Sequence, residues 1–197
     1  MNPDAPASST LDEAPAPKPS TEVSASLSPL PLPPFSGTVV ALGASAGGLD
    51  ALDRFFEALP VVPDATFVVV QHLAPEHKTM MDTLLARLTQ MPVQVAQDGT
   101  AVQAAHVYVI PPGKTMTIKE GRLHIAPRPV SGVMLPIDAF FESLALERAP
   151  RAIGIVLSGT GSDGSRGAQA LELAGGWVLA QEPESAKFDG MPRSVIA

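Results

Sequence analysis

Cysteine is absent from the 197-residue chain, which excludes disulfide bonds and thiolate metal sites. The four histidines show no metal-ligand spacing, so we expect neither a metal site nor a cofactor. Basic residues are few, 13 against 20 acidic ones, and the net charge of −7 argues against a nucleic-acid partner. No apolar run approaches the roughly 18 residues of a membrane-spanning helix, and no secretory signal pattern is present. We therefore expect a cytoplasmic protein without membrane insertion.

Proline is concentrated at one end of the chain. Nine of the 21 prolines lie in residues 1–36, among Ala, Ser and Thr. Such a segment cannot bury enough apolar surface to offset its ordering entropy. We predict a disordered Pro/Ala/Ser-rich segment over 1–36, with a proline-motif ligand for a partner as the alternative, and one domain over 37–197. Residues 190–197 read as a helix start that is cut off, which fits a truncated C-terminal end.

From Thr38 onward, apolar strands alternate with amphipathic helical segments. This alternation predicts a doubly wound α/β fold, with a mostly parallel sheet and helices on both faces. A β-hairpin at 115–125 interrupts the pattern, and we expect it to be a surface excursion. The predicted strands are 39–42, 66–70, 93–96, 107–110, 152–157 and 177–180, and the helices are 49–59, 78–89, 137–146 and 165–174.

The first predicted strand turns sharply into a helix at a serine. Gly43-Ala44-Ser45-Ala46-Gly47 matches G-x-S-x-G, the pattern of a serine nucleophile at a strand–helix turn. Glycines there permit a positive φ and leave Ser45 exposed at the helix N-terminus. The alternatives are tight packing and a dinucleotide-binding turn. The latter requires a glycine in place of Ser45 and an acid after the second strand, which instead ends in Gln71 and His72.

His72 and Asp163 are the expected partners of Ser45. All three follow predicted strands, and the carboxyl ends of parallel strands meet at one edge of a sheet. Neutral imidazole can take a serine proton near neutral pH, and an aspartate beside it fixes its tautomer. A structural histidine and a helix N-cap are the respective alternatives. Weaker candidates for the acid, none of which follows a strong buried strand, are Asp98, Asp138 and Asp189.

Five motifs occur in order along residues 38–197: Gly43–Gly48, Gln71–Leu73, Tyr108 with Pro111–Gly113, Ser158–Gly164 and Gly190–Arg193. Together they resemble the CheB-type protein-glutamate methylesterases of bacterial chemotaxis. The resemblance implies a catalytic Ser45, His72 and Asp163. It also implies a substrate and oxyanion region that includes Ala46, Gly47, Thr160 and Met191.

The activity implied by this resemblance is hydrolysis of glutamyl methyl esters on chemoreceptors through an acyl-enzyme, with deamidation of receptor glutamines as a further activity. Two departures from the family stand out. Thr160 replaces a methionine that many members carry, and 36 proline-rich residues cannot form the usual receiver domain. The chain therefore resembles modules fused ahead of a methyltransferase or sensor kinase. A non-catalytic interaction module that retains the fold is the alternative.

Overall fold

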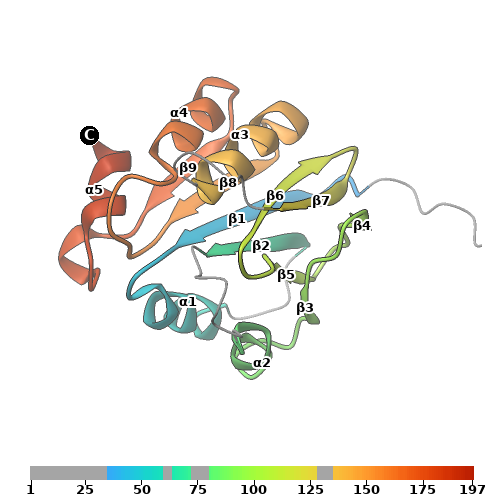
Figure 1. Ribbon diagram of the computed structural model, residues 1–197, viewed down its shortest axis with the longest axis horizontal. Helices are drawn as coiled ribbons and strands as arrows, with labels where there is room; N and C mark the ends of the chain where they lie inside the picture. Colours follow the sequence, from blue (N-terminus) through green and yellow to red (C-terminus); the bar gives the residue numbers. More distant parts are fainter. Residues whose placement is uncertain (1–34, 60–63, 72–79, 128–134) are drawn as a thin grey trace, which may run out of the picture. The chain divides into compact units, whose positions relative to one another are not determined.

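The computed structural model of the protein describes residues 35–59, 64–71, 80–127 and 135–197. Its central feature is a six-stranded sheet in the order β3-β5-β2-β1-β8-β9, in which every pair of neighbours is parallel (Figure 1). The strands are β1 (Thr38–Ala44), β2 (Ala65–Gln71), β3 (Val93–Val95), β5 (Val107–Val109), β8 (Ala152–Val156) and β9 (Trp177–Ala180). The predicted parallel sheet is confirmed.

Strand β1 lies inside the sheet, between β2 and β8. The chain first builds outward from β1 through β2, then returns to add β8 and β9 on the other side. The carboxyl ends of β1 and β8 therefore form a topological switch point, where connections leave the sheet in opposite directions and a crevice opens.

Helices cover both faces of this sheet. Alternate residues of β1 supply two separate cores, Val39 and Ala41 to one and Val40 and Leu42 to the other. The face of Val40 and Leu42 is covered by α1 (Gly48–Glu57) and α2 (Met81–Leu85), and the opposite face by α3 (Pro136–Arg148) and α4 (Ser165–Leu173) (Figure 1). The predicted doubly wound arrangement is confirmed.

The predicted hairpin is confirmed, but one of its faces is buried instead of lying free at the surface. Strands β6 (Lys114–Lys119) and β7 (Arg122–Pro127) form a second, antiparallel sheet with the short β4 (Thr100–Ala101). Met116 and Leu123 are fully buried in the same core as the aromatic residues of α3. The Ile118 N–H donates to Ser143 Oγ of α3 at 3.0 Å. One face of the hairpin therefore packs against the domain.

Helix α2 is shorter than the predicted 78–89. Its described part spans Met81–Leu85, and residues 78–79 lie outside the described ranges. After Leu85 the hydrogen bonds shorten from four-residue to three-residue spacing, so the chain leaves the helix in tight turns. The other predicted elements agree with the structure to within about two residues at most ends.

The C-terminal part adds a short 3₁₀ turn at Pro183–Ser185 and the helix α5 (Gly190–Ile196). The proposed disordered segment lies outside the described residues up to position 34. Across the described ranges, none of the helices combines the length and apolar character needed to cross a membrane.

Candidate active site

Ser45 stands directly after β1 in the turn that leads to α1. Its backbone N–H donates to Ser158 O at 3.0 Å, and its carbonyl accepts the Gly48 N–H at 2.9 Å. Gly47, the N-cap of α1, has φ of 70°, a conformation that glycine adopts without steric cost. The strand-to-helix turn predicted from the sequence is confirmed, but Ser45 is half-buried and so less exposed than expected.

Ser158, which follows β8, fastens this turn to two other segments. Its hydroxyl donates to Ala46 O at 2.9 Å and accepts from the Phe188 N–H at 3.0 Å. Its own N–H donates to the side-chain oxygen of Gln181 at 2.8 Å. Because Ser158 is fully buried, these bonds form away from solvent and hold the turn in one arrangement.

Met191 fastens α5 to the same loop. Its N–H donates to Gly159 O at 2.9 Å, and its sulfur lies so close to Gly159 that a Cβ added there would clash with it. Met191 is fully buried, so it contributes packing beside the loop. Thr160, the next residue of the loop, is exposed. Of the four residues of the expected substrate region, Ala46 and Gly47 therefore lie on the turn and Thr160 on the loop after β8, while Met191 of α5 packs against that loop.

Asp163 and Asp138 are the two buried carboxylates of the described residues. Asp163 accepts the N–H groups of Ile137 and Asp138, at 3.2 and 3.0 Å, in the first turn of α3. The Oδ1 of Asp138 accepts the N–H groups of Gly164 and Gly167, at 3.0 and 2.8 Å, at the start of α4. Asp163 therefore caps a helix, but that helix is α3 and not the helix that follows it in sequence.

Ile137 places Asp163 close to the end of β1. Its N–H is bonded to the Asp163 carboxylate, and its side chain packs so closely on Gly43 that a Cβ there would meet Cγ2 at 2.5 Å. Gly43 is two residues before Ser45. An ionised carboxylate offers about four acceptor positions, so Asp163 can serve α3 and a further partner at the same time.

His72 lies outside the described residues, so its predicted place beside Ser45 stays a prediction. The described part of β2 ends at the preceding residue, Gln71, which pairs with Ala44 at the edge of the sheet that carries Ser45. The structure thus brings Ser45 and Asp163 to the switch point between β1 and β8.

The sequence alone does not indicate the structural roles of three residues in this region. Ser158 and Gln181 join the segments of the site by hydrogen bonds. The only feature of the sequence that points to them is that each follows a predicted strand. The sequence favours Asp138 only weakly, as an alternative to Asp163 for the acid. Asp138 follows Ile137, which lies on the buried face of a helix. An acid in such a place is expected to be buried and hydrogen-bonded.

Comparison with known proteins decides the family. A family model described as CheB methylesterase matches residues 40–197, which include the Ser45 turn, the loop after β8 and all of the parallel sheet except the first two residues of β1. The chain belongs to the CheB methylesterase family. A solved structure of the Thermotoga maritima CheB methylesterase catalytic domain is similar, with a TM-score of 0.73 and 30% identity over 82% of this chain and 88% of that one.

Curated CheB relatives are similar over most of this chain. The protein-glutamate methylesterase/protein-glutamine glutaminase 1 of Myxococcus xanthus is 40% identical over 164 residues, 81% of this chain and 48% of its own length. The corresponding Salmonella typhimurium protein is 33% identical over 82% of this chain and 47% of its length. An uncharacterised 104.1 kDa protein of Rhodobacter capsulatus is 50% identical over 117 residues, 12% of its length. The chain thus spans about half the length of the methylesterase relatives.

Proposed function

We propose that this protein is a serine hydrolase that removes methyl groups from glutamyl methyl esters of chemoreceptors. The observation that carries the proposal is the position of Ser45 and Asp163 at one switch point, on a turn held by Ser158. Family membership and the names of the curated relatives support the reaction class. Deamidation of receptor glutamines through the same site is a further expected activity.

In the proposed reaction, Ser45 Oγ attacks the ester carbonyl while His72 takes the hydroxyl proton. The tetrahedral intermediate collapses, the bond to the methoxy oxygen breaks, and His72 returns the proton to that oxygen as methanol leaves. A water molecule then attacks the glutamyl–serine ester, again with His72 as base. The products are the glutamate carboxylate and a regenerated Ser45.

Asp163 is proposed to orient His72 and to stabilise the imidazolium that forms in each half-reaction. Its burial supports this role, because a charge interaction is stronger where water is excluded. The backbone N–H groups of Ala46 and Gly47 are the proposed oxyanion donors. They precede the first turn of α1, where free N–H groups and the helix dipole favour negative charge.

The proposed setting is the cytoplasmic side of chemotaxis-type signalling. The Rhodobacter relative, in which the matched part is a small share of a much longer protein, supports the hypothesis of a module fused to others. The division into a segment at 1–36 and a domain at 37–197 stays a prediction.

The test is methanol release from methylated chemoreceptor in membranes or as soluble fragments. Wild type should release methanol, and Ser45→Ala should lower the rate by at least about 10³-fold. The matched control is Ser162→Ala, which removes an exposed serine from the loop after β8. Equal rates for wild type and Ser45→Ala would contradict the proposal. A correctly folded wild type that releases no methanol would favour the alternative of a non-catalytic module.

A further inference from the structure

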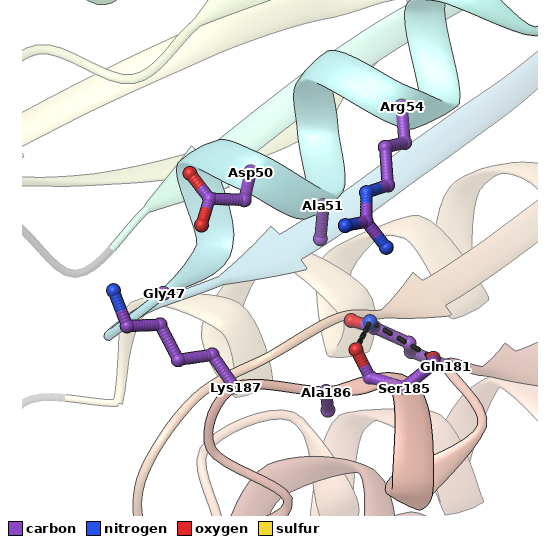
Figure 2. A pocket seen from close by; sticks show the side chains of 8 residues that line it. All are labelled: Gly47, Asp50, Ala51, Arg54, Gln181, Ser185, Ala186 and Lys187. Atoms are coloured by element: carbon purple, nitrogen blue, oxygen red, sulfur yellow. Dashed lines mark hydrogen bonds between the residues drawn. The ribbon is translucent and has the colours of Figure 1, made fainter.

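A pocket of about 270 Å³ opens beside the proposed nucleophile. One wall is formed by Gly47 and α1, and the other by the segment between β9 and α5 (Figure 2). Its lining residues are Gly47, Asp50, Ala51, Arg54, Gln181, Ser185, Ala186 and Lys187. The pocket therefore begins two residues from Ser45 and extends along the first two turns of α1.

Two cations and one carboxylate line the pocket. Figure 2 shows Arg54 pointing from α1 toward Gln181 and Ser185, while Lys187 extends along the opposite wall toward the Asp50 end. Within the described ranges, neither Arg54 nor Lys187 takes part in an ion pair. In a chain with a net charge of −7, this is a local excess of positive charge next to the reacting serine.

The wall opposite α1 is built on hydrogen bonds to the active-site turn. The Gln181 amide donates to Ser185 O and Oγ, both at 3.2 Å, and its oxygen accepts the Ser158 N–H. Ser158 in turn donates to Ala46 O. A ligand held by this wall is therefore held in a defined position relative to Ser45.

The Arg54 end of the pocket lies too far along α1 to receive the reacting ester itself. Arg54 is six residues after Gly48, which corresponds to about 9 Å along the helix axis. A methyl ester is also neutral and gives two cations nothing to neutralise. The pocket thus suits a second group of the same substrate, and its charge favours an anion.

We propose that Arg54 and Lys187 form a specificity subsite for an acidic side chain near the esterified glutamate in the substrate protein. The inference rests on the proposed function, because it places the reacting ester at Ser45. Arg54 offers a planar fork of donors to a carboxylate, and Lys187 contributes a point charge from the facing wall. The subsite selects which esters are hydrolysed and takes no part in bond making.

The test uses two synthetic peptides that carry one glutamyl methyl ester. In one peptide the flanking residues are glutamates, and in the other they are serines, which the expected deamidation cannot convert into acids. Wild type should hydrolyse the acidic peptide with roughly fivefold higher kcat/KM, and the difference should lie in KM and shrink as salt rises. The double variant Arg54→Gln/Lys187→Gln should reduce this ratio to about one.

The matched control is Lys119→Gln/Arg87→Gln, which removes the same charge from exposed positions on the hairpin and after α2. It should retain the wild-type ratio. Equal hydrolysis of both peptides by wild type would overturn the subsite and leave the proposed function intact, as would a ratio unchanged by the Arg54/Lys187 variant. If wild type hydrolyses neither peptide nor methylated receptor, the proposed function fails and the subsite fails with it.

Discussion

Asp138 and Asp163 each accept hydrogen bonds from the backbone of the segment that carries the other. Asp163 binds two N–H groups at the start of α3, and Asp138 binds two at the start of α4. Each carboxylate therefore faces the positive end of a helix dipole, which helps to keep two negative charges stable in a buried position. The loop that presents Asp163 is held from both sides by this exchange.

Removal of the Asp138 carboxylate should destabilise the fold and displace Asp163. Asp138→Ala leaves the N–H groups of Gly164 and Gly167 without their acceptor, and we expect a loss of about 2–4 kcal/mol in unfolding free energy. Asp138→Asn retains an acceptor oxygen and should cost about half as much. Urea unfolding followed by circular dichroism checks both. An alanine variant as stable as wild type would contradict the capping role.

Asp163→Asn should separate the structural role of this residue from its proposed chemical role. The amide retains an oxygen that can accept an N–H of α3, so we expect the variant to fold. Loss of the negative charge should lower kcat for methanol release by about 10³- to 10⁴-fold. Asp163→Ala, which removes both hydrogen bonds, should lose stability as well. If Asp163→Asn is fully active, the carboxylate only caps α3 and has no role in the reaction.

Gly159→Ala should destabilise the protein because the new methyl group meets the sulfur of Met191. We expect a cost of about 1–3 kcal/mol, the range for overpacking in a filled interior. In a Met191→Ala background the same substitution should cost much less, since the obstacle is gone. A double-mutant cycle of unfolding free energies measures this coupling. If the two losses in unfolding free energy simply add, the contact between residue 159 and the Met191 sulfur is not the cause of the destabilisation.

The buried phenol of Tyr108 should make the unfolding free energy depend on pH in the alkaline range. Burial raises the pKa of its phenol, whose hydroxyl donates to Ala101 O at 3.2 Å and accepts the Gln103 N–H at 3.1 Å. A raised pKa in the folded state means that the contribution of the neutral phenol is complete below the unfolded pKa of about 10. It is lost as pH rises through the folded pKa.

Wild type should therefore lose stability above about pH 10 more steeply than Tyr108→Phe. At neutral pH the Phe variant should be less stable by about 1 kcal/mol, because two backbone groups lose their partner. Since the chain has a single tyrosine, tyrosinate absorbance reports this group alone, in both folded and unfolded protein. Titration of the folded protein at or below the unfolded pKa would contradict the prediction.

The central sheet could be predicted because its strands are short apolar runs followed by turn residues, and the strand-to-helix turn at Ser45 could be predicted because it has a local pattern. The hairpin was also predicted, but the burial of one of its faces was not, for a physical reason. Met116, Ile118 and Leu123 form an apolar face, but the helix that covers it, α3, comes later in the chain. Strand β4 has two residues, too few to show a period.

Contacts between distant segments account for what the sequence did not reveal. The hydrogen bonds of Asp138 reach residues 26 and 29 positions away, and those of Ser158 reach 112 and 30. No local pattern encodes such distances. The pocket of Arg54 and Lys187 likewise combines segments more than 130 residues apart in the chain, so only the fold reveals its charge.

The most direct measurement is mass-spectrometric mapping of the serine that reacts with a fluorophosphonate probe. The account predicts a single adduct on Ser45 in the wild-type chain, unchanged in Ser162→Ala and strongly reduced in Asp163→Asn. Ser45→Ala should carry no adduct. An adduct on another serine, or equal labelling of Ser45→Ala, would contradict the claim that Ser45 is the nucleophile.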